Sequence, residues 1–78
     1  MNKNGYQGIS ARDVGRLGAF ARRIGLPDYG DIYSCVVRPG SWEWQTENAA
    51  KLRGQLEAWG YAEEPDPDVD YRVRWRRS

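Results

Sequence analysis

The spacing of apolar and polar residues predicts an amphipathic helix near the start of the chain. Apolar side chains recur at intervals of three and four residues, which places them on one face of a helix. These residues are Val14, Leu17, Ala21 and Ile24, with Phe20 at the edge of the stripe. Ser10 is suited to cap the first turn, and Gly25 is suited to end the helix. We therefore predict a helix over residues 11–24.

The same spacing indicates a second helix over residues 47–59. Its buried stripe consists of Ala49, Leu52, Leu56 and Trp59. Thr46 stands at the expected N-cap, and Gly60 follows the last periodic residue, where glycine commonly terminates a helix.

Three other segments have the composition of strands. Residues 32–38 are rich in β-branched and aromatic side chains on both faces, which is typical of a central strand that follows a turn at 28–31. After the turn dipeptide Pro39-Gly40, residues 41–45 alternate like the second arm of a hairpin, although a long helix starting at Ser41 is a competing interpretation. The last segment alternates most cleanly. Val69, Tyr71, Val73 and Trp75 share one face, and Asp70, Arg72, Arg74 and Arg76 share the other.

This order of elements predicts an α+β fold of the αββαβ type. A helical crossover joins parallel strands, so the first strand should lie between the second and the third in a sheet of order 2-1-3. Two helices would cover one face of this three-stranded sheet. We expect a single domain over residues 1–78, with residues 1–8 as a flexible tail and residues 61–68 as an acidic, proline-containing loop. The last strand would be an edge, and the protein would be a monomer or a dimer paired through that edge.

Composition excludes several classes of function. The chain has 78 residues with one cysteine and no histidine, which excludes an internal disulfide, a Cys/His zinc site and histidine-based catalysis. We expect neither an enzyme nor a cofactor, and we expect Cys35 to be a small buried hydrophobe. Residues 66–70 resemble the start of a calcium loop, but Tyr71 and Arg77 stand where that loop needs glycine and glutamate. With no secretory signal and no apolar run of membrane length, the expected location is the cytoplasm, without membrane contact.

Charge is strongly segregated along the chain, although the net charge is only +1. Residues 1–27 hold five basic groups and one acidic group, residues 57–70 hold six acidic groups and no basic one, and residues 71–78 hold four arginines. Such asymmetry indicates charged partners.

Arginine, tryptophan and acidic residues supply the candidate contact sites. The basic candidates are Arg12, Arg16 and Arg23 on one face of the first helix and Arg72, Arg74 and Arg76 on the last strand. The aromatic candidates are Trp42 and Trp44, and the acidic docking candidates are Glu63, Glu64, Asp66 and Asp68. For the tryptophan pair we expect an exposed anchor or a ring stacked on an arginine inside the fold. The competing interpretations are a solvated helix face, a charged edge that deters pairing, and pairing of the strand arginines with the acidic segment upstream.

Segregated charge with abundant aromatic residues favours a non-enzymatic protein-binding module. In its size, compact α/β layout, lack of catalytic residues and polarised surface, the chain resembles the small inhibitor proteins of phages and mobile elements, among them the anti-CRISPR proteins. That resemblance implies an inhibitor that docks on a bacterial defence complex and blocks its handling of nucleic acid. The alternative is a nucleic-acid-binding protein that contacts phosphates through the first helix and the last strand, although a pI of 7.9 is low for that class.

Overall fold

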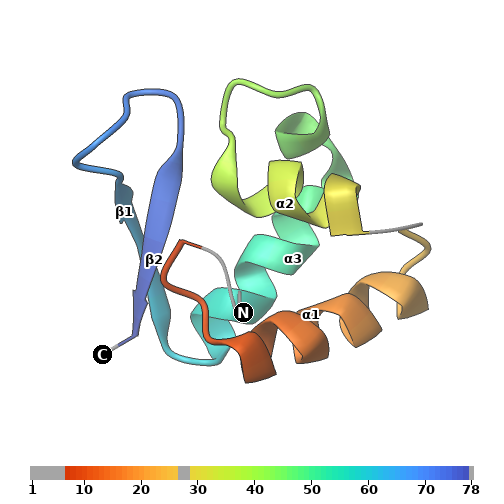
Figure 1. Cartoon of the computed structure of the whole chain (residues 1–78). Helices are drawn as coiled ribbons and strands as arrows, with labels where there is room; N and C mark the ends of the chain where they lie inside the picture. The colour runs from red at the N-terminus through yellow and green to blue at the C-terminus, as the bar shows by residue number, and fades with distance from the viewer. Residues whose placement is uncertain (1–6, 27–28, 78) are drawn as a thin grey trace.

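The computed structural model describes residues 7–26 and 29–77, with residues 29–31 described by their backbone alone. It contains three α-helices, one short 3-10 helix and a two-stranded antiparallel sheet (Figure 1). In chain order these are α1 (Ala11–Arg23), α2 (Tyr29–Val37), η1 (Glu43–Gln45), α3 (Glu47–Ala58), β1 (Tyr61–Pro65) and β2 (Val73–Arg77). The fold is α+β, as expected, but the three-stranded sheet of order 2-1-3 is wrong.

The two predicted helices are confirmed, and their caps explain where they begin. The Ser10 hydroxyl accepts the Asp13 N–H at 3.2 Å to start α1, and the Thr46 hydroxyl accepts the Ala49 N–H at 3.1 Å to start α3. Glycines at positive φ, Gly25 and Gly60, follow the two helices. The periodic residues Leu17, Ala21, Ala49, Leu52 and Leu56 are all buried.

The first predicted strand is a helix instead. Residues 32–38 lie mostly within α2, which also begins inside the expected turn at 28–31. The buried residues Ile32, Cys35 and Val36 recur at intervals of three and four, and they pack against α1 and α3. A short apolar run of β-branched residues fits a buried helix as well as a strand, and here the tertiary packing decides. The burial expected for Cys35 is confirmed.

Residues 41–45 form neither the predicted strand nor the start of a long helix. The Ser41 hydroxyl donates to the Arg38 carbonyl at 2.8 Å and accepts the Trp44 N–H at 3.3 Å, which closes a tight turn before η1. Thr46 then adopts an extended conformation, at φ −77° and ψ 156°, and this separates η1 from α3. Without strands at 32–38 and 41–45, a three-stranded sheet cannot form.

The sheet is a local hairpin made from the last quarter of the chain. β1 occupies the first half of the segment expected to be a loop, 61–68, and it pairs with β2 in the register Tyr61↔Arg77 to Pro65↔Val73. Because the Asp66 N–H donates to the Arg72 carbonyl, the alternation of the ladder turns the backbone of residue 65 outward. Proline is therefore tolerated there at no cost in hydrogen bonds.

The predicted last strand is confirmed over residues 73–76, whereas residues 69–72 belong to the hairpin turn, and β2 is not an open edge. The Trp75 N–H donates to the Gln7 carbonyl at 2.7 Å, so residues 7–9 cover the side of β2 that β1 leaves free. Of the tail expected over residues 1–8, Gln7 accepts this hydrogen bond, and residues 1–6 lie outside the described residues. β1 carries the uncovered edge of the hairpin.

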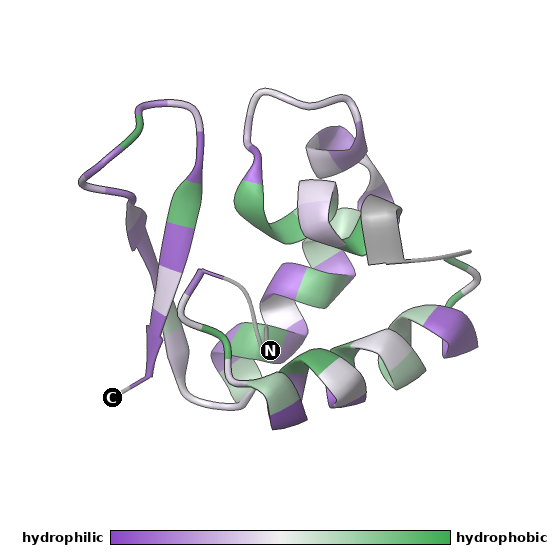
Figure 2. Ribbon diagram, in the orientation of Figure 1, coloured by the Kyte–Doolittle hydropathy of each residue, from purple (hydrophilic) through white to green (hydrophobic). Residues whose placement is uncertain are grey.

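The hydrophobic core lies between the helices and the inner face of the hairpin. Figure 2 shows that the helices carry most of the hydrophobic residues, whereas most of the hairpin is hydrophilic. Trp75 joins the two parts, because its ring is buried and its indole N–H donates to the Val36 carbonyl at 2.8 Å. Of the face predicted to point inward, Val73 and Trp75 are buried, Val69 is partly exposed, and Tyr71 faces solvent.

The contact between residues 7–9 and β2 predicts a strong effect of Gly8→Ala. Gly8 has φ +89°, and an added Cβ would lie 1.9 Å from the Trp75 carbonyl oxygen. We expect Gly8→Ala to lower the free energy of unfolding by about 2 kcal/mol or more, measured by urea denaturation followed by circular dichroism. Gly15→Ala is the matched control, because that helical position opens onto empty space. The control should gain about 1 kcal/mol, and a Gly8→Ala variant as stable as the wild type would contradict the packing described.

Candidate interaction surfaces

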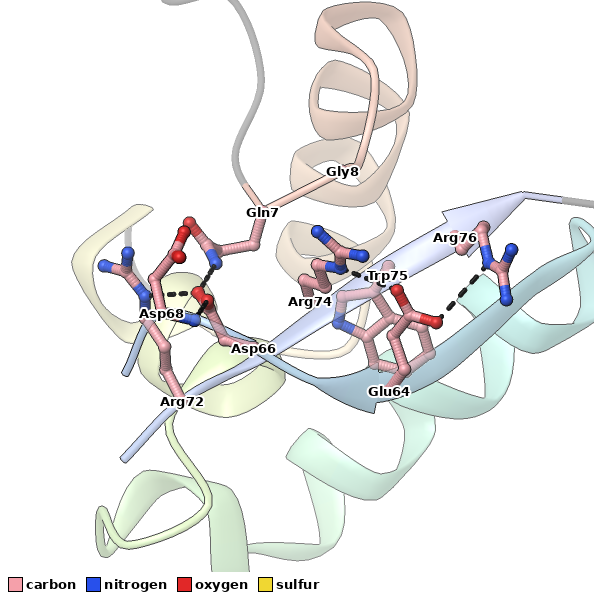
Figure 3. Close-up of a pocket in the computed structure, with 9 residues that line it drawn as sticks. All are labelled: Gln7, Gly8, Glu64, Asp66, Asp68, Arg72, Arg74, Trp75 and Arg76. Atoms are coloured by element: carbon pink, nitrogen blue, oxygen red, sulfur yellow. Dashed lines mark hydrogen bonds and ion pairs between the residues drawn. The ribbon is translucent and has the colours of Figure 1, made fainter. Parts of the chain in front are cut away.

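Arg72, which precedes β2, and Arg74 and Arg76 within it project from the outer face of the hairpin, where acidic residues pair with them (Figure 3). Arg72 Nε lies 2.8 Å from Asp66 Oδ2, and Arg74 Nε lies 2.6 Å from Glu64 Oε2. Arg76 Nε lies 3.4 Å from the second oxygen of the same Glu64. The predicted basic ladder is therefore paired with the acidic segment upstream, as one competing interpretation held.

Asp66 is held inside the turn that connects the strands. Its carboxylate accepts Gln7 Nε2 at 2.6 Å, the Asp68 backbone N–H at 2.8 Å and Arg72 Nε at 2.8 Å. The Asp68 N–H first and Arg72 second lower the pKa of Asp66 to about 2, against the opposing effect of burial. Asp66 therefore organises the hairpin, whereas Glu63 and Asp68, two other acidic docking candidates, are exposed.

Sequence analysis missed a buried cluster around Asp13. Its carboxylate accepts the Tyr61 hydroxyl at 2.5 Å, Arg16 Nη1 at 2.8 Å and Arg77 Nη1 at 3.2 Å. The Tyr61 hydroxyl is the main cause of the lowered pKa of Asp13, and burial opposes it. The cluster ties α1 to both strands. The only sequence signal was the position of Asp13 three residues after Ser10, which predicts a cap and not these distant partners.

The basic stripe predicted on α1 is divided by this cluster. Arg16 pairs with Asp13, and its guanidinium lies over the Trp59 ring at 4.1 Å. Arg12 and Arg23 are exposed, and neither forms an ion pair with a side chain that the structure describes. Arg16 is exposed as well, so Arg12 and Arg23 differ from it in having no such ion pair and not in exposure.

The predicted tryptophan pair separates into one stacked and one exposed ring, so both outcomes expected for it occur. The Arg53 guanidinium lies over the Trp44 ring at 3.9 Å and donates to the carbonyls of Cys35 and Trp44 at 2.8 and 3.0 Å. Trp44 is therefore part of the packing at the C-terminal end of α2. Trp42 is 72% exposed, and Tyr71, which was expected to face the core, is 64% exposed.

These two exposed aromatic residues belong to segments that project toward the same end of the molecule. Trp42 lies in the segment 38–45, and Tyr71 lies in the hairpin turn 66–72, both at the top of Figure 1. We call these two segments the aromatic end. They contain two arginines and four acidic residues, so this end is acidic.

Comparisons with known proteins give no match for this chain: no protein-family model, no curated protein and no solved structure is similar to it. Within the described ranges, no helix has the length and apolar character needed to cross a membrane. The same residues contain no group of three or more Cys, Asp or Glu side chains placed to hold a metal ion.

The buried cluster predicts a large effect of Asp13→Asn on stability. The substitution removes a buried charge that two arginines and a tyrosine hydroxyl contact, so we expect a loss of about 2 kcal/mol in the free energy of unfolding at neutral pH. Asp70→Asn is the control, because Asp70 is exposed. Urea denaturation of both variants measures the difference, and equal stability of the two would contradict a role for the cluster.

The lowered pKa of Asp66 predicts a loss of stability in acid. The folded-state pKa of about 2 lies below the ordinary value of 3.8, so protonation favours the unfolded chain. The contribution of the Asp66 carboxylate is complete above about pH 5 and is lost as the pH falls from about 4 to about 2. Unfolding measured across this range should show a smaller decline for Asp66→Asn than for the wild type or Asp70→Asn. Identical declines in all three proteins would contradict the assignment.

Proposed function

We propose that this protein is a non-enzymatic protein-binding module that contacts its partner through the aromatic end. The single observation that carries the proposal is the exposure of Trp42 and Tyr71, at 72% and 64%. The fold buries Trp75 and places arginines over Trp44 and Trp59, so the other three tryptophans are used in packing. Tryptophan and tyrosine are enriched among the residues that dominate binding energy at protein interfaces.

The charge of the aromatic end favours a basic partner surface. Asp68 and Asp70 flank Tyr71 in an end where acidic residues outnumber arginines. A phosphate backbone would be repelled there, whereas lysine and arginine side chains of a protein would be attracted. We therefore expect the partner to offer apolar pockets with a basic rim.

The proposal extends to the class of partner that the resemblance implied. A bacterial defence complex handles nucleic acid through basic surfaces, because phosphates require positive charge. An acidic end with two aromatic anchors is complementary to such a surface and would block it by occupying it. Inhibition of the anti-CRISPR kind therefore stays our specific prediction for this binding module.

Nucleic-acid binding through α1 is the second candidate function. The observation that favours it is that Arg12 and Arg23 are exposed and form no ion pair with the described side chains. Arg72, Arg74 and Arg76 support it less than expected, because each of them is paired with Glu64 or Asp66.

Substitution of the two exposed aromatic residues tests the proposal. The partner is first captured from a bacterial lysate with the wild-type protein and purified, and its affinity is then measured for Trp42→Ala and Tyr71→Ala. We expect each change to weaken binding roughly thirtyfold, as for an interface hot spot, without lowering the free energy of unfolding. Unchanged affinity in both variants would contradict the proposal.

The double variant Arg12→Gln/Arg23→Gln is the matched control, and it also tests the second candidate function. It should bind the protein partner like the wild type. Titration of both proteins with single- and double-stranded DNA at low and moderate salt completes the test. Salt-sensitive DNA binding that the double variant loses would favour the nucleic-acid function instead.

A further inference from the structure

The outer face of the hairpin contains a charged hollow of about 390 Å³ (Figure 3). Its lining residues are Gln7, Gly8, Glu64, Asp66, Asp68, Arg72, Arg74, Trp75 and Arg76. The charges of three arginines and three acidic residues cancel over the whole hollow, but they do not cancel at each of its ends. At one end a single carboxylate, that of Glu64, serves both Arg74 and Arg76. That end therefore has one uncompensated positive charge.

The geometry of these ion pairs leaves donor groups available. Arg74 and Arg76 both approach Glu64 through Nε, and their side chains are 47% and 75% exposed. A guanidinium has five N–H donors in a planar fork. With the described side chains, the terminal nitrogens of these two arginines form no further hydrogen bond or ion pair. Each arginine thus keeps the edge formed by its terminal nitrogens for an external acceptor.

We infer that Arg74 and Arg76 form a binding site for an acidic side chain of a protein partner. A carboxylate is planar and presents two oxygens, which match two parallel N–H donors of a guanidinium. Its single negative charge balances the single uncompensated positive charge beside Glu64. A nucleic-acid strand fits less well, because successive phosphates along the hollow would meet Asp66 and Asp68.

Glu64 gives the site a specific signature. Its two oxygens lie 2.6 and 3.4 Å from the Nε atoms of Arg74 and Arg76, so it competes with an incoming carboxylate for the same cations. Removal of this carboxylate should strengthen binding of an external acid, whereas removal of either arginine should weaken it. A pair of arginines that serves only to stabilise the hairpin would show no such opposite effects.

This site does not depend on the aromatic end. Its residues lie on the strands and not at Trp42 or Tyr71, and its test uses small peptides instead of the captured partner. Failure of the proposed aromatic contact would therefore not contradict this inference, and failure of this inference would not contradict the aromatic contact.

Titration of the ¹⁵N-labelled full chain with short peptides tests the inference. The probe is N-acetyl-Gly-Glu-Gly-amide, and the matched control peptide has glutamine in place of glutamate. We expect the glutamate peptide to shift the side-chain Nε resonances of Arg74 and Arg76 in the NMR spectrum, with millimolar affinity, and the glutamine peptide to leave them unchanged. Equal shifts with both peptides, or none with the glutamate peptide, would overturn the inference.

Three variants distinguish a specific binding site from general electrostatic attraction. We expect Arg76→Gln to bind the glutamate peptide about fivefold more weakly and Glu64→Gln to bind it about fivefold more tightly. Arg12→Gln, which removes an exposed arginine from α1, should bind it like the wild type. Weakening by Arg12→Gln equal to that by Arg76→Gln, or no gain in Glu64→Gln, would overturn the site. Inorganic phosphate bound more tightly than the peptide would overturn its assignment to a carboxylate.

Discussion

Burial of the Trp75 ring is the constraint on which the rest of this structure depends. The side chain reaches the core from β2, and its indole N–H donates to the Val36 carbonyl of α2. Because side chains alternate along a strand, an inward Trp75 forces Arg74 and Arg76 outward. The same residue donates its backbone N–H to the Gln7 carbonyl, which holds residues 7–9 along the hairpin. One large aromatic residue thus joins the helices, the sheet and the N-terminal segment, which suits a small protein with few aliphatic residues.

Local signals made part of the fold predictable. The caps at Ser10 and Thr46 and the apolar stripes they precede need only neighbouring residues, so α1 and α3 follow from the sequence. The structure of segment 32–38 does not follow from the sequence. Its β-branched residues fit a strand and its buried positions fit a helix, and only packing against α1 and α3 selects the helix. The misassignment of 32–38 supplied a central strand that does not exist, and the crossover argument that gave the order 2-1-3 depended on that strand. The true partner of β2 was the neighbouring acidic segment, where proline and repeated acids disfavour a strand by composition.

Some features of the candidate sites could likewise be predicted from local sequence, whereas others depend on distant residues. The outward direction of Arg72, Arg74 and Arg76 follows from period two, which is local. Their pairing with Glu64 and Asp66 follows from the register of a hairpin that was not predicted. The Asp13 cluster depends on Tyr61 and Arg77, at sequence separations of 48 and 64 residues, and no spacing rule brings these residues together. Tyr71 is exposed because β2 starts only at Val73. Residues 69–72 precede that strand, so their alternation does not place one face against the core.

Folding also changes what the charge segregation means. The acidic segment folds back on the basic end of the chain, so Glu64 and Asp66 pair with Arg72, Arg74 and Arg76 across the hairpin, and one positive charge beside Glu64 is left uncompensated. Several charged residues form no ion pair with a described side chain, among them the exposed Arg12 and Arg23 of α1 and Asp68 and Asp70 of the aromatic end. In Figure 1, α1 and the aromatic end lie on opposite sides of the molecule. These two groups of opposite charge contribute a dipole to a nearly neutral protein. Such a dipole orients a small protein as it approaches a charged surface, and it would bring Trp42 and Tyr71 first to a basic one.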